Sequence, residues 1–177
     1  MLFRSFVFWL DRRDGGSVEA LYGQHLDAAG IPQWTVDGKA IYAETGNSVT
    51  SFTCMLFDGG ILMSWMKVSG SGYADTLFAK KIDYNGNDVW ANASTVATKN
   101  GTVGLTPYAY NSFPNDSGAF IAYTIIYIGG SSAFLLNRVG FNGDVRWAVN
   151  SKSFALSGYD YRSCWDGDNG LYAVSKG

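Results

Sequence analysis

The sequence predicts an all-β protein, on three observations. Aromatic residues make up 16% of its 177 residues and glycine occurs 22 times, a combination typical of strands joined by tight turns. Only two glutamates are present, Glu19 and Glu44, although glutamate is a common helix former. Finally, one hairpin pattern occurs three times along the chain. We therefore expect little or no helix.

The repeated hairpins occupy Leu21–Trp34, Leu77–Trp90 and Phe134–Trp147, and their starts lie 56 and 57 residues apart. Each contains a glycine at the same offset and a tryptophan four residues later. The glycines are Gly30, Gly86 and Gly143. In two of the three, Asn-Gly supplies the positive φ of a tight turn. The tryptophan is expected to open the returning strand as a large apolar anchor.

The repeat extends to four antiparallel strands. An apolar run centred on an aromatic residue precedes the three hairpins by 12, 12 and 11 residues, and those aromatic residues are Trp9, Trp65 and Tyr123. Before each later run, turn signals such as Asp58–Gly60 mark the end of a further strand. The central copy thus predicts four strands, over Val49–Phe57, Ile61–Val68, Ala74–Asp83 and Asp88–Val96.

Four strands in a repeat of about 57 residues are typical of β-propeller blades, which bury both faces only when neighbours stack on them. The chain divides as one domain, residues 1–177, into approximate units 1–46 (partial), 47–102, 103–157 and 158–177 (partial). A single β-sandwich or barrel with fortuitous internal similarity is the alternative, and three matched hairpins disfavour it.

Three repeats do not close a propeller, which typically has four to eight blades. One hypothesis is that the chain is a fragment of a larger propeller. The other, which we favour, is a homodimer closed as a six-bladed ring. There Tyr159–Trp165 of one copy completes the first sheet of the other. One strand per copy is then redundant, Leu171–Lys176 or Phe3–Asp11, and the longer N-terminal strand is expected to keep its place.

The run Trp9–Arg13 and the hairpin that follows it resemble the tryptophan-rich repeats of large secreted or surface β-propeller proteins of bacteria. The hairpin alone is also similar to the repeat of pyrroloquinoline-quinone enzyme propellers, with an Asp-to-Gly spacing one residue shorter. The resemblance implies a propeller and an extracellular or cell-surface location. An Asp and an Arg follow the strand tryptophan in the secreted repeats, and only Asp11 and Arg13 match them here.

Composition excludes several partners. The formal net charge is -2 and the pI is near 5.2, so there is no strong positive field to attract nucleic acid. No apolar run reaches the roughly 20 residues of a membrane span, and the N-terminal segment does not read as a signal peptide. We expect no cofactor, no metal, no nucleic acid and no membrane partner.

The first strands of the units supply the candidate binding residues. Tyrosine, asparagine and arginine side chains there are suited to stacking on and hydrogen-bonding a sugar or peptide. The candidates are Tyr108, Tyr110, Asn111, Tyr159, Tyr161 and Arg162. The one carboxylate among these strands, Asp160, is expected to pair with Arg162 rather than to act as an acid of raised pKa.

These residues give three hypotheses. The first is a non-enzymatic β-propeller module that serves as a binding or scaffolding surface for glycan or protein. The second is a carbohydrate-active enzyme, a glycosidase or lyase, that uses Asp160 and a loop carboxylate such as Asp11, Asp14 or Asp166 at the channel mouth. The third is a purely structural repeat within a longer adhesin. We favour the non-enzymatic module, because the chain lacks a recognisable catalytic constellation.

His25 is the only histidine, and the other repeats carry Lys81 and Arg138 at its position. We therefore expect an exposed polar residue rather than a catalytic base or metal ligand. Cys54 and Cys164 fall at the same position of two different first strands. Repeat geometry places them too far apart for a disulfide, so buried thiols are expected.

Two acidic segments, Asp83–Asp88 and Asp166–Gly170, have oxygen-bearing side chains at alternate positions, as calcium loops do. No glutamate follows either segment to complete such a loop. Both are therefore predicted to be turns.

Overall fold

The computed structural model describes residues 5–13, 19–69, 74–99, 103–127, 130–148, 152–154 and 159–176. These residues form thirteen β-strands and no helix. The prediction of an all-β protein is confirmed.

The strands form four antiparallel sheets, numbered here in chain order. Sheet 1 contains β1 (Ser5–Asp11), β2 (Ala20–Leu26) and β3 (Lys39–Tyr42). Sheet 2 contains β4 (Asn47–Phe57), β5 (Gly60–Ser69), β6 (Thr76–Ile82) and β7 (Ser94–Thr98). Sheet 3 contains β8 (Val103–Asn115), β9 (Gly118–Tyr127), β10 (Ser132–Gly140) and β11 (Lys152–Phe154). Sheet 4 contains β12 (Tyr159–Trp165) and β13 (Leu171–Lys176).

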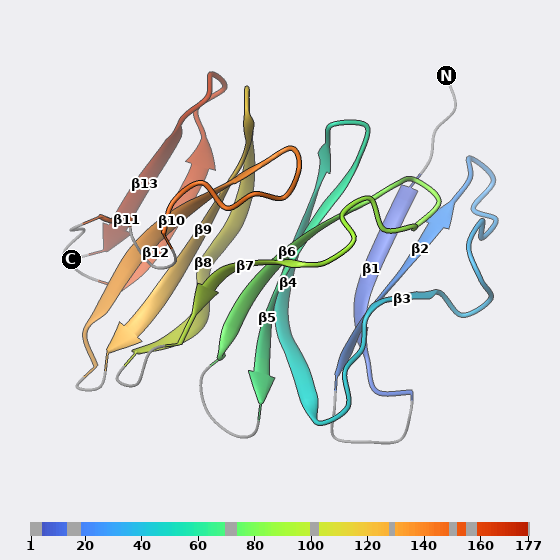
Figure 1. The fold of residues 1–177 in the computed structure, drawn as a ribbon, viewed down its shortest axis with the longest axis horizontal. Helices are drawn as coiled ribbons and strands as arrows, with labels where there is room; N and C mark the ends of the chain where they lie inside the picture. The colour runs from blue at the N-terminus through green and yellow to red at the C-terminus, as the bar shows by residue number, and fades with distance from the viewer. Residues whose placement is uncertain are drawn as a thin grey trace.

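Each sheet falls within one of the repeat units inferred from the sequence, and β12 and β13 have the predicted bounds. Sheets 2 and 3 hold all four strands of the repeat. Sheet 1 holds the second, third and fourth, and sheet 4 holds the first and second. The sheets stand side by side along the long axis, with sheet 1 and sheet 4 at opposite ends (Figure 1).

A separate apolar core fills each of the three junctions between neighbouring sheets. Sheet 2 is covered on both faces, because Met63 and Trp65 of β5 face sheet 1 whereas Leu62 and Met66 face sheet 3. All four side chains are at most 1% exposed. A strand buried on both faces needs a continuous apolar run rather than an alternating one. Double coverage therefore accounts for the sequence of β5.

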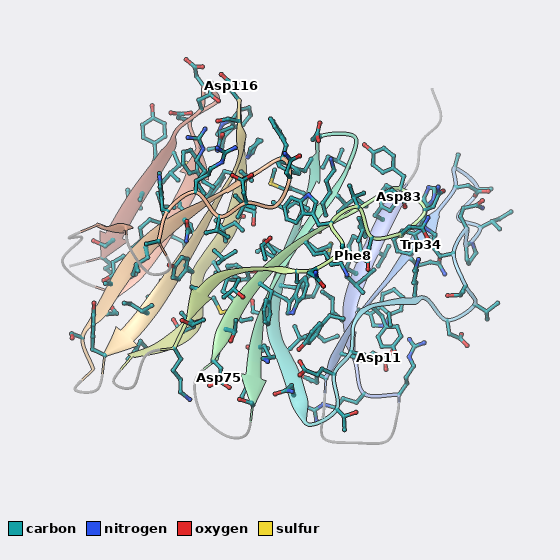
Figure 2. The ribbon with its side chains drawn as sticks, viewed as in Figure 1. Phe8, Asp11, Trp34, Asp75, Asp83 and Asp116 are labelled. Carbon is teal, nitrogen blue, oxygen red and sulfur yellow. The ribbon has the colours of Figure 1, made fainter. Side chains whose placement is uncertain are left out.

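The repeated tryptophan crosses to the next sheet. Trp34 Nε1 donates a hydrogen bond to the carbonyl of Tyr84, 3.2 Å away, and Trp90 Nε1 donates to the carbonyl of Phe141, 2.9 Å away. Both carbonyls lie at the same place in the turn of the following sheet, two residues before Gly86 or Gly143. Figure 2 shows Trp34 beside the turn that begins at Asp83.

This docking corrects the predicted role of the tryptophan. Instead of opening the fourth strand of its own sheet, Trp90 lies in an irregular segment, and the strand begins only at Ser94 rather than at Asp88. The physical reason is that the indole gains a buried hydrogen-bond partner only on the neighbouring sheet.

Hydrogen bonds also join neighbouring sheets at the opposite end of each junction. The amide of Val49 donates to the carbonyl of Glu19 (2.8 Å), and Ala74 and Leu105 exchange two backbone bonds of 3.2 Å. At the third junction the Tyr161 hydroxyl donates to the carbonyl of Ser132 (3.2 Å). In each case the first strand of one sheet is joined to the start of the third strand of the sheet before it.

Substitution of the glycines tests the tryptophan docking. A Cβ at Gly143 would lie 2.8 Å from Trp90 Cδ2, whereas a Cβ at Gly46 would meet nothing within 4 Å. Both residues have positive φ, so alanine brings a similar backbone cost at either site. We expect Gly143→Ala to lower the free energy of unfolding by about 1–3 kcal/mol more than Gly46→Ala, measured by urea denaturation. Equal losses would show that the indole does not press on this turn.

Candidate functional site

Two open pockets lie at the tryptophan ends of the first two junctions. The first turn pocket, about 410 Å³, is lined by His25, Gln33, Trp34, Thr35, Lys39 and Asn85. The second turn pocket is about 500 Å³. Its lining includes Asp58, Lys81, Trp90, Ser94 and Asn142. Each pocket is therefore built from one sheet together with the turn of the next.

The two pockets are repeats of one another. Each contains the docked tryptophan, Trp34 or Trp90, and the asparagine that precedes the turn glycine of the next sheet, Asn85 or Asn142. Each also contains a nitrogen-bearing side chain from the third strand of the repeat, His25 or Lys81. The same three positions recur because the same junction recurs.

A buried glutamine holds the loop around the first turn pocket. Gln24 accepts a hydrogen bond from the amide of Trp34 (2.8 Å) and donates one to the carbonyl of Thr35 (2.9 Å). Lys39 reaches the next sheet, where its Nζ donates to Asn87 Oδ1 (3.2 Å). The polar groups of this pocket are therefore positioned by contacts within the chain before any ligand arrives.

His25 differs from its prediction. It is half-buried, and its ring stacks on Phe6 with centroids 4.6 Å apart and meets the edge of Trp34 at 6.4 Å. The expectation of an exposed residue was wrong, because His25 pairs with Phe6 across β1 and β2 and faces the turn of sheet 2. Its Nε2 atom is buried, with no hydrogen-bond partner among the described residues.

The equivalent cations are also less exposed than expected. Lys81 is 6% exposed, and its ammonium group lies 2.5 Å from Asp58 Oδ2 and 5.7 Å from the centre of the Phe57 ring. Arg138 is half-buried over Phe120. Aromatic rings of the neighbouring strands cover this position in each repeat, so a cation there is held against a π face.

Asp11, a candidate acid in the sequence, is the centre of an ion pair. Its carboxylate accepts hydrogen bonds from Trp9 Nε1 (3.0 Å), Arg13 Nε (2.8 Å) and the Arg13 amide (2.7 Å). Arg13 in turn lies over the Tyr22 ring, 3.9 Å from its centre. The hydrogen bond from Arg13, followed by that from Trp9, lowers the pKa of Asp11 to about 2. Such a carboxylate stays ionised at neutral pH, the opposite of what a general acid needs.

The candidate binding residues of the first strands differ in burial. Tyr110 and Tyr161 pack between sheets, and Tyr161 is 1% exposed against Phe134. Burial raises the pKa of Tyr110 well above its usual range. Asn111 and Arg162 are exposed. The side chains of Tyr108, Tyr159 and Asp160 lie outside the described residues.

Tyr110 packs beside a hydroxyl cluster that no sequence signal indicated. Thr53, Ser64 and Ser112 form a triangle with oxygen distances of 2.7, 2.8 and 3.1 Å. The three residues come from two different sheets, so their meeting depends on the way the sheets stack. The cluster pairs hydroxyl groups of β4, β5 and β8 with one another at the junction of sheets 2 and 3.

Both cysteines are exposed, so the expectation of buried thiols was wrong. They also point in opposite directions. Cys54 pairs with Met63 and faces sheet 1, whereas Cys164 pairs with the exposed Tyr172 on the face turned away from sheet 3. The turn between β12 and β13 shifts the pairing by one residue relative to that between β4 and β5, and such a shift reverses the face of every side chain.

The acidic segments form turns, as predicted. Asp83 Oδ1 accepts the amides of Asn85 and Asn87, and Asp166 Oδ1 accepts those of Asp168 and Gly170. Within the described part of the chain, no three His, Cys, Asp or Glu side chains gather in a way that would hold a metal ion.

The comparisons with known proteins give no match, whether to a family model, a curated protein or a solved structure. No helix of membrane-spanning length and hydropathy occurs among the residues that the structure describes. The function must therefore be argued from the geometry of this chain.

The Asp11 ion pair predicts a specific acid sensitivity. The folded-state pKa of about 2 lies below the ordinary value of 3.8, so the stabilisation is complete above about pH 5 and is lost as the pH falls toward 2. We expect Asp11→Asn to be less stable than wild type at pH 7 and to lose less stability between pH 5 and pH 2. Urea denaturation across that range measures both curves. Parallel curves would contradict the lowered pKa.

Proposed function

We propose that the chain is a non-enzymatic β-propeller module that binds neutral glycans in its turn pockets. The observation that carries the proposal is the recurrence of one pocket, with the same three chemical positions, at two successive junctions. The recurrence places an indole, an asparagine and a nitrogen-bearing side chain together at two successive sites on one chain.

The lining favours a sugar over a charged ligand. Asn85 offers a side-chain amide to sugar hydroxyls. Gln33 and Thr35 offer acceptor oxygens, because the Gln33 amide nitrogen donates to Asp27 and Ile31 and the Thr35 hydroxyl donates to Gly38. The half-buried indole of Trp34 adds an apolar surface of the kind on which the C–H face of a sugar packs. In the second pocket the charge of Lys81 is balanced by Asp58, so that site offers no strong attraction for an anion.

Two weak pockets on one chain can together bind a polymeric ligand more tightly than either pocket binds a single sugar. A shallow, open pocket with a few hydrogen bonds is expected to bind one sugar weakly. Two such pockets on one chain engage a repeating polysaccharide together, and the second contact is then intramolecular. Successive pockets one junction apart thus favour a polymeric ligand, typical of the extracellular or bacterial-surface location that the sequence resemblance implies.

The geometry gives the carbohydrate-active enzyme less support. Asp11 has a lowered pKa and is fully engaged by Arg13 and Trp9, so it is unsuited to donate a proton to a glycosidic oxygen. It also lies at the opposite end of sheet 1 from Trp34 (Figure 2). A glycosidase that used Asp11 would therefore act away from both turn pockets.

A glycan array followed by calorimetry tests the proposal. We expect binding of a neutral oligosaccharide or polysaccharide, weakened about two- to tenfold by Asn85→Ala, since one hydrogen bond is lost. Asn111→Ala is the matched control, because Asn111 is also an exposed asparagine but lies on β8, away from the lining of either turn pocket.

The outcomes separate the alternatives. Loss of binding in Asn111→Ala with no change in Asn85→Ala would place the ligand on the first strands instead. Turnover of the glycan, or an array without any bound sugar, would overturn the proposal.

A further inference from the structure

The turn at Gly30 lacks the contact that the equivalent turns make. A Cβ at Gly86 would lie 3.0 Å from Trp34 Cε2 and one at Gly143 would lie 2.8 Å from Trp90 Cδ2, because each turn carries the tryptophan of the preceding sheet. A Cβ at Gly30 would meet nothing within 4 Å. Ile31 beside it is 57% exposed. The Gly30 turn of sheet 1 therefore has space for an indole to pack on it.

The edge of sheet 1 lacks a strand as well. Among the described residues, sheet 1 has no strand equivalent to β4 or β8, and β1 is its edge. An apolar groove of about 320 Å³ lies in front of β4, lined by Phe6 and Phe8 of β1, by Cys54, Met55 and Leu56 of β4, and by Ile61. At the next junction the corresponding space is filled by first strands in contact, as the bond between Thr53 and Ser112 shows.

Sheet 4 has the complementary deficit. It contains a first strand, β12, and no third or fourth strand in the described part of the chain. Its second strand, β13, is buried on one side only, since Tyr172 is 65% and Val174 61% exposed. Sheet 3, which precedes it, carries Trp147, the repeat equivalent of Trp34 and Trp90, and this indole packs on Phe120 of its own sheet with ring centroids 5.9 Å apart.

We propose that a second copy of this chain fills both deficits. β12 of one copy pairs with the free edge of the partner's β1, and Trp147 docks on the partner's Gly30 turn. By repeat equivalence, Trp147 Nε1 donates to the carbonyl of the partner's Ala28, which occupies the place of Tyr84 and Phe141. We call this interface, β12 on β1 and Trp147 on the Gly30 turn, the seam. A two-fold axis generates the seam twice and closes a ring of six four-stranded sheets. The inference rests on the propeller architecture and is independent of glycan binding.

In this dimer β12 keeps one antiparallel neighbour but changes which strand that neighbour is. β12 gives up its backbone bonds to β13 and makes equivalent bonds to β1, so the strand pairing itself changes little. The apolar contacts change in two ways. Leu171 and Ala173 of β13 leave the core beside sheet 3, whereas the groove beside Phe6 and Phe8 is filled and the exposed Val7 of β1 comes to face sheet 3 of the other copy. The unpaired edge of β1, an aggregation hazard in a lone copy, disappears.

The seam also creates a third turn pocket. Arg138 stands where His25 and Lys81 stand in the other repeats, and Trp147 stands where Trp34 and Trp90 stand. The partner's Gly30 turn supplies the remaining wall. Neither copy forms this pocket alone, so the dimer has one more pocket at each seam than two separate chains have.

Sedimentation of the full chain at micromolar concentration tests the closure. We expect a folded species of about twice 19.2 kDa. A folded monomer would overturn the proposal, and so would an open-ended series of higher assemblies, because head-to-tail contacts that do not close grow into filaments.

A pair of glycine variants locates the seam. Gly30 and Gly46 share φ +79 and open surroundings, so alanine has the same effect on the backbone of a single copy. Only Gly30 lies in the turn on which the partner's Trp147 is proposed to dock, where a Cβ would press on that indole. We expect Gly30→Ala to raise the dimer dissociation constant at least tenfold and Gly46→Ala to leave it unchanged. Equal effects would overturn the seam.

Hydrogen exchange on the full-length dimer tests the strand assignment without any substitution. The amides of β1 that point to its free edge are expected to become protected on dimerisation, while those of β13 exchange rapidly. Protection of β13 together with free exchange at that edge of β1 would show that a dimer, if present, uses another surface. Loss of glycan binding with the dimer intact would bear on the proposed function alone.

Discussion

The structure depends on one interaction: the tryptophan that crosses a junction ties one sheet to the next. Trp34 and Trp90 donate to carbonyls of the following turn and press on its glycine. Burial of an indole takes its N–H away from water, and for Trp34 and Trp90 a carbonyl of the neighbouring turn replaces that hydrogen-bond partner. Sheet packing and turn geometry are therefore one constraint, and neither Gly86 nor Gly143 can gain a side chain without disturbing the sheet before it.

The turn pockets are a by-product of the same constraint. To reach the next sheet, the chain leaves the ladder after β2 and β6 and makes an irregular crossing before the fourth strand, which delays β7 to Ser94. The space between this crossing and the next turn is the pocket. Its polar side chains lie on segments whose backbone is held from within, by Gln24 at the first junction and by the bond from Ser94 to the Gly143 carbonyl at the second. A repeat that packs in this way presents a preformed pocket at each junction.

Periodicity in the sequence predicted the four sheets, the division of the chain between them and the turn roles of Asp83 and Asp166. It failed wherever the answer depended on what stands on the neighbouring sheet. The repeat shows that Trp90 recurs, but the partner of its indole is 51 residues away. His25 and Lys81 were predicted to be surface residues because polar or cationic side chains occupy their position in all three repeats, yet rings of adjacent elements cover them. Cys54 and Cys164 align in sequence and face opposite ways, because the pairing of β12 with β13 is shifted by one residue relative to that of β4 with β5.

The third repeat shows which part of the turn the junction requires. Asp27 and Asp83 close their turns with carboxylates, but Gly140 stands at that position in the third hairpin. The space a side chain would take there is filled instead by Asp144 and Arg146, which pair with each other. The backbone bond that closes the turn is 3.0 Å in all three copies, from the glycine amide to the residue three before it. The Phe141 carbonyl consequently remains where Trp90 needs it. The junction selects the position of a carbonyl group rather than the identity of a side chain, and the repeats are free to diverge in sequence as long as that carbonyl stays in place.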